Sequence, residues 1–199
     1  MTRQTSPPMA PSNEATDEQL DVARTQGDAY HQAMRAMAEE EGAHTAQAGD
    51  YLIGFVNEEA EGMYALDGEC VVWREAAEDA NVHLEVAVAD AADGRFIPGL
   101  DVHLELSRDG IPVLATDLPF LWHPFLYHYG TNAKVPDEGP YRVTIRIAPA
   151  TFMRHDPVNG LRYTRSTEVH FDNITLTNGR KPSPDAQPRG AAAPTATGA

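Results

Sequence analysis

A histidine and a carboxylate two residues apart are the first candidates for chemistry in this sequence. In the segment NVHLEVAVAD, an extended strand would send alternate side chains to opposite faces. His83 and Glu85 would then project together, while Val82, Leu84 and Val86 occupy the other face. An imidazole and a carboxylate at one strand end supply half of a site for a transition-metal ion. The alternative is a solvated polar face, the commoner role for such a pair.

The segment DLPFLWHPFLYHYGTN holds the densest group of candidate residues. His123 and His128 lie five residues apart among aromatic and proline side chains. Such neighbours restrict the rotamers and lower the local dielectric, which favours metal ligation by a neutral imidazole. An equally weighted alternative is an aromatic loop that closes one end of the domain, with both histidines hydrogen-bonded. His155, in APATFMRHDPVNG, is a third candidate ligand, although a lone histidine beside a turn is more often a surface residue.

Motifs for other kinds of chemistry are missing. The sequence contains no G-x-S-x-G elbow, P-loop, dinucleotide fingerprint or H-E-x-x-H motif. Its single cysteine, Cys70, excludes an internal disulfide and a thiolate zinc cage. We therefore predict that the protein is not an enzyme and has no catalytic residues. The other histidines are interpreted as structural or solvated: His31, His44, His103 and His170.

The charge of the chain restricts its partners. Thirty acidic residues stand against fifteen basic ones, for a formal net charge of −15, and Lys134 and Lys181 are the only lysines. Nucleic acid is excluded as an expected partner because phosphate binding needs a positive patch. So acidic a surface, poor in lysine, is typical of proteins from halophilic organisms. The first residues, MTRQTSPPMAPSNEA, lack the apolar stretch of a secretory signal, so the sequence leaves the compartment open.

Local patterning predicts one domain with a helical segment and two tails. Residues 1–16 and 179–199 are rich in Pro, Ala, Ser, Thr and Gly, which is typical of disordered tails. Residues 17–47 place apolar side chains at helical spacing, predicting one helix interrupted at Gly27 or two short helices. Residues 48–178 predict a β domain. Its strands are expected near 51–56, 63–73, 81–90, 100–107, 112–116, 140–148 and 166–176. This order favours a mainly β protein with an antiparallel β-sandwich.

Four short motifs follow one another along the chain: HLE at 83–85, HYG-x-N at 128–132, YRVTIRIAP at 141–149 and MRHD at 153–156. In these motifs and their order, the sequence resembles the periplasmic ferrous-iron/copper-binding transport proteins. The match is closest to archaeal relatives of unassigned function that carry the LPFLWHP and LYHYG segments. The resemblance implies an immunoglobulin-like sandwich. It also implies a homodimer, a membrane permease as partner and an extracytoplasmic location.

By position, the resemblance assigns metal ligands to His83, Glu85, His128 and His155. That family also supplies a methionine a few residues before HYG, and here the corresponding stretch around Phe120 has none. We expect His123 to substitute for it. Imidazoles with one carboxylate favour Cu(II) or Fe(II)/Fe(III), with Zn(II) as a further candidate.

The leading functional hypothesis is therefore capture or transport of iron or copper. The alternative is a non-catalytic immunoglobulin-like interaction or adhesion domain in which the histidines are structural. A metal-dependent oxidase or hydrolase would need an open coordination position and a substrate cleft, and the sequence demonstrates neither.

Overall fold

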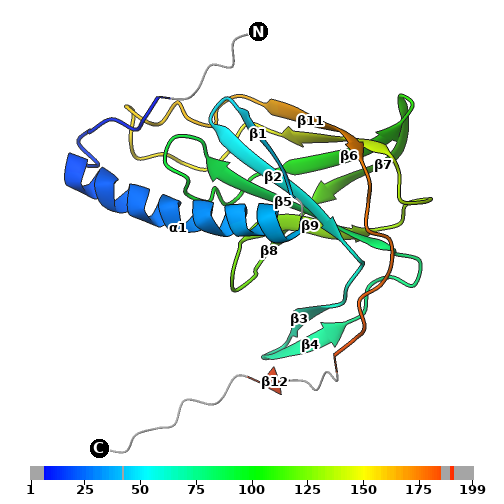
Figure 1. The fold of residues 1–199 in the computed structure, drawn as a ribbon. Helices are drawn as coiled ribbons and strands as arrows, with labels where there is room; N and C mark the ends of the chain where they lie inside the picture. The colour runs from blue at the N-terminus through cyan, green and yellow to red at the C-terminus, as the bar shows by residue number, and fades with distance from the viewer. Residues whose placement is uncertain (1–6, 42, 185–188, 191–199) are drawn as a thin grey trace, which may run out of the picture.

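The computed structural model describes residues 7–41, 43–184 and 189–190, in which one helix precedes a series of short strands (Figure 1). The elements are α1 (Asp17–Glu41), β1 (His44–Ala48), β2 (Tyr51–Glu58), β3 (Met63–Asp67), β4 (Cys70–Arg74), β5 (Val82–Asp90), β6 (Val102–Arg108), β7 (Ile111–Leu118), β8 (Phe120–Leu121), β9 (His128–Ala133), β10 (Tyr141–Ile147), β11 (Thr167–Ile174) and β12 (Arg189–Gly190). The protein is mainly β, as the sequence predicted.

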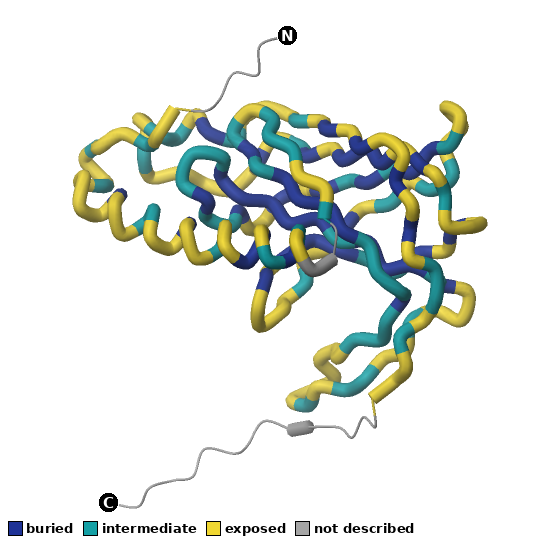
Figure 2. The backbone as a smooth tube through the Cα atoms, viewed as in Figure 1, coloured by how far each residue is buried: buried dark blue, intermediate teal, exposed yellow. Residues whose placement is uncertain are grey.

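Two antiparallel sheets form the sandwich. One has the order β1-β2-β5-β9-β8, and the other has the order β11-β10-β6-β7. Alternate residues of the central strands, such as Leu84 and Val86 of β5 and Leu104 and Ile145 of the facing sheet, are fully buried between the sheets. Figure 2 shows these strands as the most deeply buried part of the chain. A separate sheet of order β12-β4-β3 stands away from the sandwich (Figure 1).

Helix α1 lies across the outer face of the five-stranded sheet (Figure 1). Met34 and Met37 of the helix pack against Val56, Ala87 and Leu126 in a second apolar cluster. The small residues on this face of β2 and β5 let the helix approach closely, because a longer side chain there would hold it off. The five-stranded sheet is thus covered on both faces, by the other sheet and by a helix.

The helix differs from the prediction in two respects. It runs unbroken through Gly27, where a Cβ would lie 1.6 Å from the carbonyl oxygen of Asp93, so the glycine serves close packing and not a break. The helix also ends at Glu41, and the remainder of the predicted helical segment 17–47 includes strand β1. Pairing of β1 with β2 along its whole length overrides the weak helical pattern there.

The predicted strands match the structure except at two places. The single strand expected near 63–73 is the hairpin β3–β4, which turns at Gly68 with a positive φ of 62°. The aromatic segment expected as a loop contains the short strand β8 and continues into strand β9 from His128. Of the predicted tails, residues 7–16 and 179–184 contact the domain, for example through the Asn159 amide and Ala10. The other tail residues, apart from β12, lie outside the described ranges. Within those ranges, no helix is long and apolar enough to cross a membrane.

Candidate metal centre

Strands β5 and β9 bring the predicted residues together on the outer face of the five-stranded sheet. Their antiparallel register sets His83 opposite Asn132 and Glu85 opposite Gly130, with His128 at the start of β9. His83 and Glu85 project to the same face, as the alternation predicted, while their neighbours Val82, Leu84 and Val86 enter the sandwich core. Since Gly130 has no side chain, His128 can lie beside Glu85. A Cβ at position 130 would come within 3.3 Å of the His128 ring.

Both imidazoles face the same carboxylate. Nε2 of His83 lies 3.4 Å from Glu85 Oε1, and Nε2 of His128 lies 3.6 Å from Glu85 Oε2. The three side chains each offer a ligand atom within 4.8 Å of the others. His83 is 1% exposed and His128 is 7% exposed, so the site is drawn from groups that are almost wholly removed from water.

The proton on His83 is positioned by Asn132. The Asn132 amide nitrogen donates to the Glu61 carbonyl at 2.7 Å, and its oxygen accepts the Glu61 N–H at 3.1 Å. These two bonds fix the amide orientation, so its oxygen is the atom that faces His83 Nδ1 at 3.1 Å. A neutral His83 therefore carries its proton on Nδ1 and presents the Nε2 lone pair. That Nε2 is buried and has no hydrogen-bond partner.

His128 is held in the same tautomer by the backbone. Its Nδ1 donates to the carbonyl oxygen of Leu126 at 2.9 Å, which leaves the Nε2 lone pair facing Glu85. Burial lowers the pKa of both His83 and His128, because the imidazolium form loses its hydration. Both rings are accordingly neutral near pH 7.

Two lone pairs and a carboxylate directed at one point fit a cation. Electron pairs that face one another in a buried site repel unless a positive charge lies between them. A metal ion would satisfy the orphaned Nε2 of His83 and draw on donors already turned toward it. The Asn132 and Leu126 contacts are the kind of outer hydrogen bonds that orient histidine ligands in metal sites.

The structure places the other two predicted ligands differently. His123 lines the same cavity, and its ring centroid lies 6.1 Å from that of His128. Its Nδ1 accepts the N–H groups of Phe125 and Leu126 at 3.2 and 3.3 Å, so a neutral His123 carries its proton on Nε2 and offers no lone pair there. His155 lies exposed on the loop after β10, outside the group formed by the other three.

Several residues of this cavity were not predicted from the sequence. The cavity measures about 260 Å³, and Glu58, Glu61, Met37 and Lys181 contribute to its lining. Oxygen atoms of Glu58 and Glu61 join one of Glu85 in a group within 4.8 Å. Glu58 pairs with His83 across β2 and β5. The run NEEAEG at 57–62 signalled local acidity, but only the strand pairing turns it toward the histidines.

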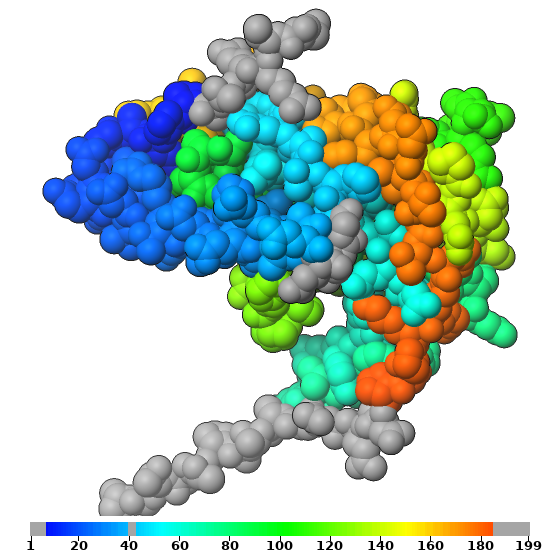
Figure 3. Space-filling model, in the orientation of Figure 1, coloured from blue at the N-terminus to red at the C-terminus, as the bar shows by residue number. Residues whose placement is uncertain are grey.

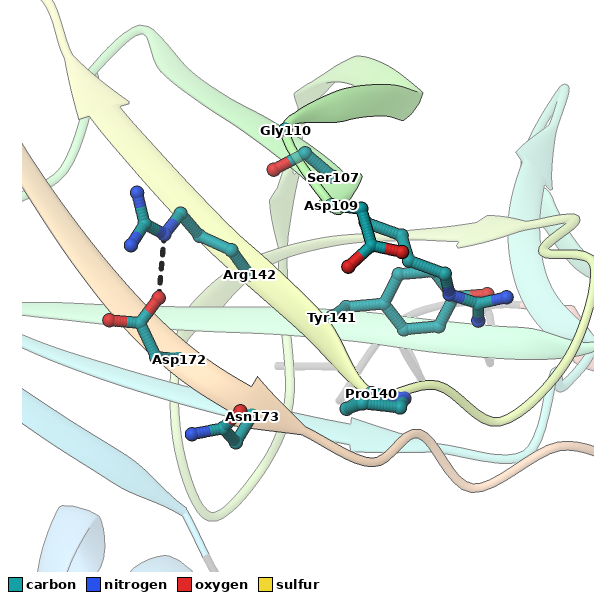
Figure 4. A pocket seen from close by; sticks show the side chains of 9 residues that line it. Ser107, Asp109, Gly110, Pro140, Tyr141, Arg142, Asp172 and Asn173 are labelled. Atoms are coloured by element: carbon teal, nitrogen blue, oxygen red, sulfur yellow. Dashed lines mark hydrogen bonds and ion pairs between the residues drawn. The ribbon is translucent and has the colours of Figure 1, made fainter.

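A second hollow lies on the other sheet, between the β6–β7 turn and the start of β10 (Figure 4). It is lined by Tyr141, Arg142 and Asp172 among others, and an Arg142–Asp172 ion pair at 2.6 Å crosses one side of it. Arg108, which also lines the hollow, pairs with Asp137 on the surface. No group of metal-ligating side chains occurs in this hollow among the described residues.

Comparisons with known proteins agree with this architecture. A model of the family described as Fe2+ transport protein matches residues 59–176. P19 of Campylobacter jejuni, in a copper-reconstituted crystal structure, has a TM-score of 0.55 at 19% identity, covering 69% of this chain and 96% of its own. FetP of uropathogenic Escherichia coli strain F11 has a TM-score of 0.52 at 20% identity, covering 67% and 93%.

A copper-bound variant of FetP has a TM-score of 0.51 at 18% identity, covering 68% of this chain and 97% of its own. No curated protein matches the chain in sequence. At these identities the solved structures establish the sandwich fold.

Proposed function

The chain belongs to the Fe2+ transport protein family, and from this premise we propose that it captures and delivers iron or copper through His83, Glu85 and His128. The observation that carries the proposal is the orphaned, buried Nε2 of His83, directed at a carboxylate that a second imidazole also faces. A purely structural histidine would use both ring nitrogens in hydrogen bonds.

The donor set favours ions of intermediate hardness. Two imidazole nitrogens and one carboxylate oxygen suit Fe(II), Cu(II) and Zn(II). Copper is bound by P19 and by the FetP variant in their crystal structures, and the family description names Fe2+. We propose iron or copper as the ion carried, with Zn(II) as a convenient probe of the same donors.

The proposal extends to the remaining candidate ligands and to the partners. His123 would coordinate only after its ring turns away from the two backbone N–H groups that it accepts. His155 is exposed in its own chain, which suits a ligand supplied to the site of a second copy in a homodimer. An extracytoplasmic location and delivery to a membrane permease are proposed from the family membership alone.

Calorimetric titration with Cu(II), Zn(II) and anaerobic Fe(II) at pH 7 tests the site. His83→Ala and His128→Ala should each weaken binding by about 100-fold, equivalent to about 2.7 kcal/mol. His103→Ala is the matched control, because His103 lies on β6 and pairs with Asp117 at 2.8 Å. Wild-type binding no tighter than about millimolar, near −4 kcal/mol, would refute metal transport as the function.

An interaction domain is the second candidate, favoured by the aromatic residues beside the site. Trp122 is 70% exposed and Phe125 is 58% exposed, and large exposed aromatic side chains are typical of binding surfaces. Under this alternative, Trp122→Ala would abolish binding of a protein partner and His83→Ala would leave it intact. Under the metal-transport proposal, Trp122→Ala leaves metal affinity unchanged.

A further inference from the structure

The cavity beside the two imidazoles already contains a cation that belongs to the chain. The ammonium group of Lys181 forms ion pairs with Glu58 and with Glu61, the latter at 3.0 Å. These two glutamates share the cavity with Glu85, which also faces His83 and His128. One carboxylate thus belongs both to the proposed metal site and to the cluster that holds the lysine.

Lys181 is held there by its own backbone. The N–H of Lys181 donates to the Ala60 carbonyl at 2.9 Å, and the N–H of Gly179 donates to the Asn81 carbonyl at 2.8 Å. Arg180 donates to carbonyl groups of the loop before β5, including that of Ala77. Figure 3 shows this orange-red segment packed against the cyan segment that follows β2. The backbone of Lys181 is therefore fixed beside the cavity, and its side chain enters from a fixed position.

The position of Lys181 has an electrostatic consequence for a metal ion. Without the ammonium group, Glu58 and Glu61 would add two negative charges to the field at the His83 and His128 nitrogens. The ammonium group offsets that field and also repels an incoming dication directly. Residue 181 lies beyond residues 59–176 that the family model matches, and it is one of only two lysines in the chain.

We propose that Lys181 is a tethered competitor of the metal ion: it occupies the carboxylate side of the cavity and lowers the affinity of the His83–Glu85–His128 group. This inference rests on the proposed metal-binding function and adds its regulation. Weaker affinity suits a protein that must release its ion, since a carrier that binds too tightly cannot deliver. Movement of the segment 177–184 away from Glu58 and Glu61 would strengthen binding.

The test is a Zn(II) titration at pH 7 of wild type, Lys181→Met and Lys134→Met. Both substitutions remove one lysine charge, but Lys134 lies on the surface beside Asp79, with 67% of its side chain exposed. We expect Lys181→Met to tighten Zn(II) binding by about tenfold, from the loss of a unit charge near a dication. Lys134→Met should change it by less than about twofold. Unchanged or weaker binding in Lys181→Met overturns the proposal.

Two further measurements separate this result from other failures. Lys181→Gln removes the charge but keeps hydrogen-bond donors for the glutamates, and it should also tighten Zn(II) binding. It serves as the test variant if Lys181→Met is poorly folded. The metal-free Lys181→Met protein should melt at a lower temperature than wild type and gain more from added Zn(II). If His83→Ala and His128→Ala leave wild-type affinity unchanged, the proposed function itself fails. If they abolish binding and Lys181→Met changes nothing, only the competitor role fails.

Discussion

Replacement of Asn132 by leucine probes the tautomer that makes His83 a ligand. Leucine has similar size and no acceptor, so it removes the oxygen that faces His83 Nδ1 at 3.1 Å. The proton of a neutral His83 is then free to move to Nε2. There the N–H group can donate a hydrogen bond to Glu85 Oε1, which lies 3.4 Å away. The Nε2 lone pair is lost as a metal ligand in that form.

The magnitude follows from the bond that metal binding must break. A hydrogen bond from Nε2–H to a carboxylate contributes about 1.5–3 kcal/mol, and a metal ion must displace it before it can bind His83. The expected loss of affinity is therefore about 10- to 100-fold, the range typical of outer-shell substitutions in metal sites. Asn132→Asp is the control, because its carboxylate still accepts from Nδ1 and keeps the tautomer.

Calorimetry with Zn(II) at pH 7 measures both variants, and thermal melting of the metal-free proteins checks that they fold. Asn132→Leu should lose affinity and Asn132→Asp should keep most of it. Equal affinity of wild type and Asn132→Leu, in a folded protein, would refute the reasoning that Asn132 prepares His83. Equal losses in both variants would show that Asn132 acts by holding the backbone of Glu61 and not by fixing the tautomer of His83.

Three further predictions concern stability. Gly27→Ala should destabilise the protein by about 1–3 kcal/mol in urea unfolding, reversing the usual gain from alanine in a helix, because its Cβ would lie 1.6 Å from the Asp93 carbonyl oxygen. Arg162→Met should cost about 3–5 kcal/mol, because it removes the buried guanidinium that pairs with Asp90 at 2.8 Å. The stability of the metal-free protein should fall as pH falls below about 6.5, because the two buried imidazoles of the site have lowered pKa values and the unfolded chain takes up protons first. Urea midpoints at pH 7.5 and 5.0 measure this slope, which should be shallower when both imidazoles are replaced by alanine.

The same pKa shifts bear on metal release. Because burial holds the two imidazoles neutral, protons compete with the metal ion only at lower pH than they would at a solvated histidine. We expect acid to release the metal from this site, at a lower pH than from a solvated histidine site. Release at neutral pH must then use another means, and the proposed competition by Lys181 supplies one.

The sequence alone determined that His83 and Glu85 share one face of a strand, and that the chain after position 50 is mainly β. Alternation in NVHLEVAVAD placed His83 and Glu85 on one side of a strand, because strand geometry has a period of two whatever the strand pairs with. Turn residues and the absence of long helical patterns after position 50 indicated an antiparallel sandwich. The family resemblance was also readable, since its motifs are contiguous pieces of sequence.

Only the tertiary structure decided which residues meet. The register of β9 on β5 sets Gly130 opposite Glu85 and so brings His128 to the carboxylate, and register is a long-range property that local patterning does not contain. The tautomer of His83 depends on a hydrogen bond to Asn132, which is 49 positions away in the sequence. That of His123 depends on a hydrogen bond from Leu126, three positions away. The directions of these bonds are known only from the three-dimensional structure. Lys181 reaches Glu58 across 123 residues of sequence, from a segment whose composition predicted a disordered tail. Local sequence sets the face on which a side chain projects, and long-range packing sets what it faces.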